Sequence, residues 1–255
     1  MANGAASRRV PTVRPRVYPA GRAVVLLAVC APELAGRRLA IEGHRVQAIR
    51  FGRLALLLAF VDQHDYSLEE IERKRDDAGW LSSQARLLEQ AVERARTNAA
   101  VLPMRLLTVF AHSGALEEAA REHYARWSRA LTRLGPKREC VVHVYAGPHA
   151  PPGGEPYLVR ISQRSSRTAR VPALKADAAV AAHALQLWGA CTRVATATRR
   201  VQTGNRRGAL WSAALLVNER DVATLAALVR GSAENGAPLG VSAYVELPRA
   251  PFTFV

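Results

Sequence analysis

Residues that could bind a metal or perform covalent chemistry are scattered along this sequence. The chain has seven histidines, yet no two of them stand at metal-ligand spacing and no His-Glu-x-x-His motif occurs. The sequence also lacks a Gly-x-Ser-x-Gly elbow, a phosphate-binding P-loop and a dinucleotide fingerprint. We therefore expect no enzymatic activity, no metal and no other cofactor.

One tight cluster of titratable residues stands out, formed by Asp62, His64 and Asp65. It could hold a cation weakly or serve an unrecognised small-molecule enzyme, because such clusters often mark functional sites. The polar stretch around it favours a solvated loop instead. His143 falls within a strand pattern, which favours a packed residue over a ligand.

The three cysteines, Cys30, Cys140 and Cys191, lie far apart among apolar residues, and no Cys-x-x-Cys pair occurs. We interpret them as buried free thiols in a reducing compartment, which is typical of a cytoplasmic protein.

The charge is strongly positive, with 36 basic against 21 acidic residues and a formal net charge of +15. Such a balance favours nucleic acid, acidic membrane surfaces or acidic partners, although an arginine-rich composition also follows from GC-rich coding. The densest group of arginines comprises Arg193, Arg199, Arg200, Arg206 and Arg207. These could contact phosphates without sequence specificity, meet an acidic protein, or form a solvated surface.

The first residues divide into a basic segment and an apolar run. Residues 1–20 are rich in arginine and proline and are expected to form a flexible basic tail. Ser7-Arg8-Arg9 ahead of the apolar run resembles an export signal, but prolines separate the two parts, and the run 24–29 favours a buried strand. No segment is long enough to span a membrane.

Residues 21–100 are predicted to form a small N-terminal α+β domain. Two strands joined at Gly52 follow the strand at 24–29. Ser67 can cap a helix with an acidic first turn, and Ser82 or Ser83 can cap a second helix over 82–99 with one apolar stripe.

Residues 101–255 are predicted to form a ferredoxin-like domain, which makes the whole chain an α+β protein. The pattern indicates strands at 105–110, 140–146, 210–217 and 241–247, with helices at 116–134 and after Asp221. Gly135 can end the first of these helices in a left-handed conformation. An insertion at about 147–208, which includes a helix over 173–201, separates the two β-α-β halves, and residues 248–255 form a tail.

Several segments together resemble the gas vesicle protein F/L family. Val101 to Phe110 is similar to the family's Val-Leu-Pro-Leu-Arg-Phe-Gly-Thr-Val-Phe, and Leu247 to Val255 resembles its Gly-Pro-Trp-Pro-Pro-Tyr-Ser-Phe-Val terminus. Leu106-Leu107 stands where the family has Phe-Gly, and Arg249-Ala250 where it has Trp-Pro. The residues that carry the resemblance are Leu102, Pro103, Arg105, Phe110, Tyr145, Tyr157, Pro248 and Pro251.

The resemblance implies a non-catalytic role in building gas vesicles. It implies binding to the hydrophobic shell protein, gas vesicle protein A, or to other vesicle accessory proteins, and a vesicle-associated location in the cytoplasm. Phe252 and Phe254 could reach such a partner, although packing within the protein itself is favoured. The alternative is a polyanion-binding or RNA-binding module of ferredoxin-like fold, but the strands lack the aromatic motif of such modules.

Overall fold

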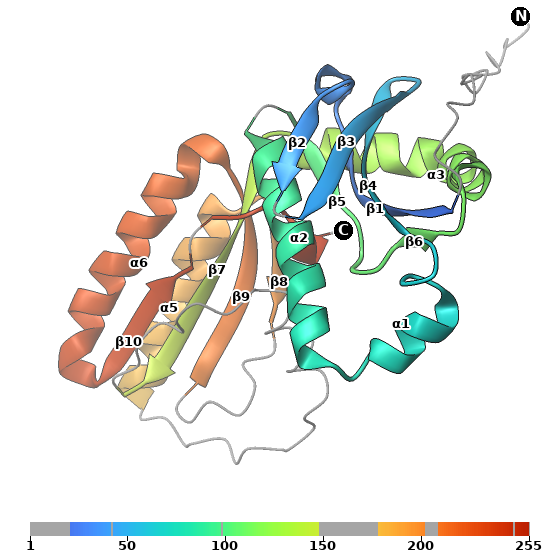
Figure 1. Ribbon diagram of the computed structural model, residues 1–255. Helices are drawn as coiled ribbons and strands as arrows, with labels where there is room; N and C mark the ends of the chain where they lie inside the picture. Colours follow the sequence, from blue (N-terminus) through green and yellow to red (C-terminus); the bar gives the residue numbers. More distant parts are fainter. Residues whose placement is uncertain are drawn as a thin grey trace, which may run out of the picture. The chain divides into compact units, whose positions relative to one another are not determined.

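The computed structural model describes residues 21–41, 43–97, 99–147, 178–201, 209–246 and 248–254 (Figure 1). The chain divides into two compact units at Arg133–Leu134, and each unit is built on its own antiparallel sheet. The protein is therefore a mixed α/β protein. The expected boundary near residue 100 differs from this division, because the segment after residue 100 pairs with the first strand of the chain.

The sheet of the first unit has the order β2-β3-β4-β1-β5, with β6 also paired to β1. The expected strand at 24–29 lies in the interior of this sheet, between β4 on one side and β5 and β6 on the other, and eight of the nine residues of β1 are buried. A strand that is apolar on both faces needs a covered, central position. The strands are β1 (Arg22–Cys30), β2 (Arg38–Ile41), β3 (His44–Phe51), β4 (Leu54–Asp62), β5 (Val101–Pro103) and β6 (Val109–Phe110).

Three helices complete the first unit, α1 (Leu68–Lys74), α2 (Ala78–Arg96) and α3 (Ser113–Leu134). Ser67 caps α1 as predicted, since its hydroxyl accepts the N–H of Glu70. The predicted cap of α2 is wrong. Asp77, not Ser82 or Ser83, accepts the first N–H groups, so the helix begins one turn earlier. The helix at 116–134 is confirmed, and Gly135 follows it with a φ of 47°.

The expected strand at 105–110 is confirmed only at Val109–Phe110, and it belongs to the first sheet. Val24 and Val25 of β1 pair with Phe110 and Val109. Because local apolar patterning does not determine which strand a segment pairs with, the sequence could not assign this segment to a sheet.

The second unit follows the order β7, α5, β8, β9, α6, β10 among the described residues, and its sheet has the order β10-β7-β9-β8. All three pairings are antiparallel. Apolar side chains of both helices pack on one face of this sheet, against Val142 and Leu215 (Figure 1). The elements are β7 (Lys137–Ala146), α5 (Ala178–Val194), β8 (Ala197–Arg200), β9 (Ala209–Asn218), α6 (Val222–Gly236) and β10 (Val241–Val245). Short 3-10 turns lie at Glu219–Asp221, Ala237–Leu239 and Phe252–Phe254 in this unit and at Pro32–Leu34 in the first.

The predicted insertion at 147–208 is wrong in part. It contains α5 and β8, which are integral to the second unit, and the expected helix over 173–201 ends at Val194. The predicted helix extended past Val194 because the alanine-rich composition continues beyond it. Pairing with β9, and not local composition, determines the strand conformation of Ala197–Arg200. Residues 1–20 and most of the expected insertion, residues 148–177 and 202–208, lie outside the described residues.

Candidate functional site

The segment that carries the family resemblance forms a short loop pinned to a bulge in β1. The register of β1 against β4 shifts between Leu26 and Ala28, so Leu27 is an extra residue. On the opposite edge, Met104 N–H donates to the Leu27 carbonyl and Leu26 N–H donates to the Thr108 carbonyl, both at 2.9 Å. Residues 104–108 therefore leave the sheet between β5 and β6 and return to it at once.

Leu107 lies at the tip of this loop with a φ of 61°. It is the one non-glycine residue with positive φ among the residues that the structure describes. The left-handed region costs an ordinary L-residue about 1–2 kcal/mol, and glycine is its usual occupant. The departure from Phe-Gly in the sequence thus falls at the position where the backbone favours glycine.

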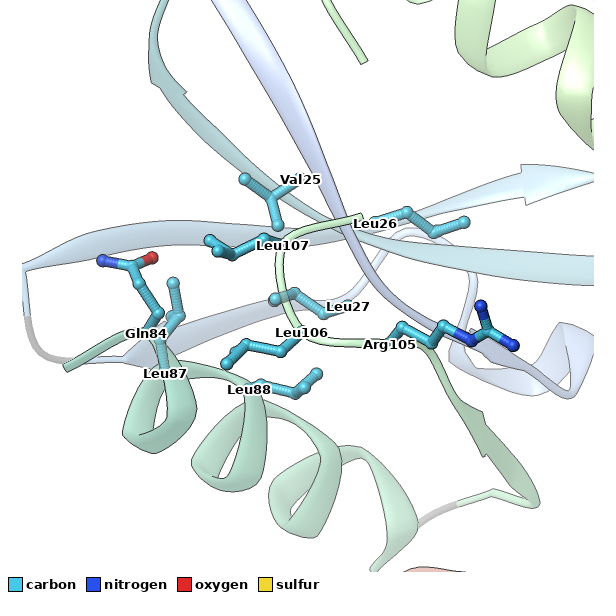
Figure 2. Close-up of a pocket in the computed structure, with 9 residues that line it drawn as sticks. All are labelled: Val25, Leu26, Leu27, Gln84, Leu87, Leu88, Arg105, Leu106 and Leu107. Atoms are coloured by element: carbon cyan, nitrogen blue, oxygen red, sulfur yellow. The ribbon is translucent and has the colours of Figure 1, made fainter. Parts of the chain in front are cut away.

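The loop covers an apolar cleft beside α2 (Figure 2). Leu106 points toward Leu87 and Leu88 of the helix, whereas the Arg105 side chain points away from them. The cleft encloses only about 10 Å³, about enough for one water molecule and far below the roughly 300–1,000 Å³ of most small-molecule sites. Its lining residues are Val25, Leu26, Leu27, Gln84, Leu87, Leu88, Arg105, Leu106 and Leu107.

Four residues that carry the resemblance lie in this loop or in the strands that flank it. Leu102 and Pro103 are buried in β5, Arg105 is exposed and Phe110 is half-buried in β6. Leu106 and Leu107 are also half-buried. The loop therefore presents leucine side chains at the surface from a rigidly held backbone.

A buried chain of polar side chains crosses the second sheet on the face opposite α5 and α6. Ser212 Oγ lies 2.7 Å from His143 Nδ1, and His143 Nε2 lies 3.0 Å from Glu246 Oε1. Arg249 pairs with the same carboxylate. Burial raises the pKa of Glu246, but the His143 hydrogen bond and the Arg249 charge outweigh it and hold the pKa at about 2.

The hydrogen-bonded side chains of Ser212, His143 and Glu246 have the hydroxyl–imidazole–carboxylate order of a catalytic triad. However, Ser212 is only 3% exposed and His143 is fully buried, so the hydroxyl cannot meet a substrate. Tyr145 and Tyr244 stack beside the imidazole. The arrangement therefore ties β7, β9 and β10 together, and the prediction that His143 is a packed residue is confirmed.

The C-terminal segment packs onto the same face. Arg249 exchanges backbone hydrogen bonds with Glu139 of β7, and the fully buried Glu139 carboxylate accepts the Thr253 N–H and hydroxyl at 2.6 and 2.7 Å. Phe254 is buried and Phe252 half-buried, as the favoured self-packing of this tail predicts. Pro248 and Pro251 flank the bridge at Arg249, and Pro251 is buried.

The predicted arginine group lies at the edge of the second sheet. Arg199 and Arg200 are exposed on β8, and Arg193 is exposed in the last turn of α5. Arg199 Nη1 donates to the Thr253 carbonyl at 2.6 Å. Arg206, Arg207 and the motif residue Tyr157 lie outside the described residues.

The other chemical candidates carry no site. Asp62, His64 and Asp65 are all exposed, and within the described ranges no group of His, Cys, Asp and Glu could hold a metal ion. Burial raises the pKa of the Cys30 and Cys191 thiols to about 12 and that of Cys140 to about 11. These three cysteines are free and buried, as predicted. No described helix has both the length and the apolar character needed to cross a bilayer.

Sequence reasoning missed the polar chain and the contact between Glu139 and Thr253. His143 is 69 residues from Ser212 and 103 residues from Glu246 along the chain, so no local spacing signals their contact. A polar residue within each of three apolar strands was the available signal.

Comparison with known proteins identifies the class of protein to which this chain belongs. A model of the family "Gas vesicle synthesis protein GvpL/GvpF" matches residues 24–255. The chain therefore belongs to this gas vesicle protein family.

Two kinds of relative support the assignment. Gas vesicle protein L of Streptomyces sp. (strain CB03234) is 29% identical over 110 residues, which span 43% of this chain and 41% of that protein, less than half of its length. The crystal structure of gas vesicle protein GvpF from Anabaena sp. PCC7120 matches with a TM-score of 0.58 at 12% identity, over 91% of this chain and 97% of that one. The GvpF structure from Microcystis aeruginosa matches with a TM-score of 0.59 at 13% identity, over 91% and 98%. These structural likenesses show a shared fold.

Proposed function

We propose that this protein is a gas vesicle assembly factor or minor vesicle component that acts in the cytoplasm by binding other proteins, without catalysis. Its partners are the hydrophobic shell protein, gas vesicle protein A, or other vesicle accessory proteins. The observation that carries this proposal is the family match across residues 24–255. The shared fold with two GvpF structures supports it.

The loop at 104–108 is the part of the first unit best suited to an apolar partner. A shell subunit must cover its apolar surface before it joins a wall, and a partner for it needs apolar side chains at its own surface. Leu106 and Leu107 are half-buried, and their backbone is held on β1 at both ends of the loop. A pinned loop loses little conformational entropy when it binds.

We further infer that the second unit is a ferredoxin-like domain, although its fourth strand is β8 and not the strand expected at 105–110. Its element order is β-α-β-β-α-β and its sheet order is β10-β7-β9-β8. The face of this sheet opposite the helices carries Tyr145, which is fully buried, so base stacking as in RNA-binding modules lacks its aromatic platform.

Co-expression of tagged protein with the shell protein tests the main proposal. We expect the shell protein to co-purify with the wild type and with Leu68→Asp, since Leu68 is an exposed leucine of α1 that does not line the cleft. Leu106→Asp should lose the shell protein while its circular dichroism stays unchanged. Failure of the wild type to retain shell protein or any vesicle accessory protein would rule out the proposal.

Non-specific polyanion binding is the second candidate, favoured by the exposed Arg193, Arg199 and Arg200. It predicts binding to an unrelated nucleic acid that weakens steeply with salt and with Arg199→Ala plus Arg200→Ala. The absence of binding at low salt would exclude it.

A further inference from the structure

The strand β8 is an exposed edge of the second sheet. Among the residues that the structure describes it pairs only with β9, and all four of its residues, Ala197–Arg200, are exposed. An edge strand presents unpaired backbone N–H and C=O groups that can pair with an added strand. This edge belongs to the second unit, whereas the apolar loop proposed to bind the shell protein belongs to the first.

The register of β8 identifies which backbone groups point outward. Val201 N–H donates to the Ser212 carbonyl, and Arg199 is opposite Ala214. In an antiparallel pair, hydrogen bonds to one neighbour come from alternate residues. Residues 197, 199 and 201 therefore bond to β9, and the N–H and C=O groups of Thr198 and Arg200 face the open edge.

Positive charge lies on both faces of this edge. Arg199 is opposite Ala214 and lies on the face that carries the C-terminal segment, where it contacts Thr253. Arg200 is opposite Ala213, whose side chain packs under the helices, so Arg200 shares that face with α5 and its Arg193. The sequence contains no acidic residue between Asp177 and Glu219. A strand added beside β8 would thus meet arginine on either face.

We propose that β8 is a docking edge for an extended acidic segment of another protein, which adds to the sheet as a further strand. A second copy of this edge is a poor occupant, because like charges opposite each other destabilise a strand pair. Nucleic acid is also a poor occupant, because phosphates accept hydrogen bonds but cannot donate to the outward carbonyls. The same arginines thus exclude self-pairing and select an acidic strand.

The occupant must come from another molecule. The parts of the chain outside the described residues carry only three acidic residues, Glu42, Glu155 and Asp177, and none of these is next to another acidic residue. A strand that forms ion pairs with both Arg199 and Arg200 needs acidic residues at adjacent positions, since neighbouring residues on a strand point to opposite faces of the sheet.

The test uses the full chain and a fluorescein-labelled, capped peptide Thr-Val-Thr-Glu-Glu-Thr-Val-Thr, with fluorescence anisotropy as the readout. The decisive variant is Thr198→Pro, which removes one outward N–H yet leaves the β9 pairing intact, because proline is tolerated on the open side of an edge strand. Thr198→Ala is the matched control that keeps the N–H. We expect Thr198→Ala to bind like the wild type and Thr198→Pro to bind about tenfold more weakly.

Two further arms separate strand addition from charge alone. The peptide with Lys-Lys in place of Glu-Glu should not bind, and Arg200→Glu should abolish binding of the acidic peptide. Equal binding by the Thr198→Pro and Thr198→Ala variants would overturn the proposal. So would tighter binding of an oligothymidylate of about twenty nucleotides that Thr198→Pro leaves unaffected.

Hydrogen exchange on the wild-type chain tests the proposal independently of whether the proline variant folds. Bound peptide should slow amide exchange at Thr198 and Arg200, the two residues whose N–H groups face outward. Unchanged exchange at both residues with saturating peptide would also overturn the proposal.

Discussion

Glu139 of β7 accepts two hydrogen bonds from Thr253, which lies 114 residues later and near the end of the chain. The carboxylate is fully buried, so its interactions within the protein replace those with water. A buried charge that loses a donor is costly, and this contact therefore couples the C-terminal segment to the stability of the second unit.

Replacement of Thr253 by valine should test this coupling. Thr253→Val keeps the shape but removes the hydroxyl that donates to Glu139 Oε1 at 2.7 Å. We expect a loss of about 1.5–3 kcal/mol in the free energy of unfolding, because the acceptor is charged and buried. Urea-induced unfolding gives the value, and Thr253→Ser, which keeps the donor, should lie close to the wild type. Equal losses in the two variants would contradict a role for the hydroxyl.

Glu246 should make stability depend on pH in the acid range. Its pKa is about 2 in the folded protein against an ordinary value of 4.5. A lowered pKa stabilises the folded state above about pH 4.5, and this contribution is lost as the pH falls toward about 2. The difference in unfolding free energy between wild type and Glu246→Gln should therefore be largest near neutral pH and shrink on acidification. A difference that stays constant from neutral pH to pH 2 would argue against the ion pair with Arg249.

Leu107 should reverse the usual order of alanine and glycine. At ordinary positions an alanine variant is more stable than a glycine variant, but a φ of 61° favours glycine. We expect Leu107→Gly to be more stable than Leu107→Ala by about 1 kcal/mol. Thermal or urea unfolding of both variants measures the difference in their unfolding free energies. Both variants lose the leucine side chain, so the effect of that loss largely cancels in the difference. Greater stability of the alanine variant would show that the loop is not left-handed there.

Two glycines of α6 should respond oppositely to alanine. A Cβ at Gly236 would lie 2.8 Å from His183 Nε2, which hydrogen-bonds to the Ser232 carbonyl, whereas nothing lies within 4 Å of a Cβ at Gly231. Gly236→Ala should destabilise the protein by about 1–3 kcal/mol through overpacking. Gly231→Ala should stabilise it by about 0.5–1 kcal/mol, as in other helix interiors. Like-signed effects on the unfolding free energy would contradict this packing of α5 against α6.

The candidate sites were predictable from the sequence to different degrees. The free cysteines, the solvated cluster at Asp62 and the self-packed tail followed from local composition. The arginines at 199 and 200 were recognised as an exposed basic group, but not as part of a strand, because Ala195 to Ala197 continues the helical composition of α5. Leu107 stands where the family pattern has glycine, whereas the polar chain at His143 joins residues that are far apart along the sequence.

The sequence by itself determined the local elements and the family. The apolar run in β1 requires burial on both faces, the helical stripe of α2 requires one covered side, and the segments around Pro103 and Pro248 carry the family resemblance. Only the tertiary structure decided that β5 and β6 join the first sheet, that β8 is an exposed edge, and that Glu139 meets Thr253. The physical reason is that strand pairing and polar contacts between distant residues depend on where the whole chain is placed, whereas apolar periodicity reports only which side of an element is buried.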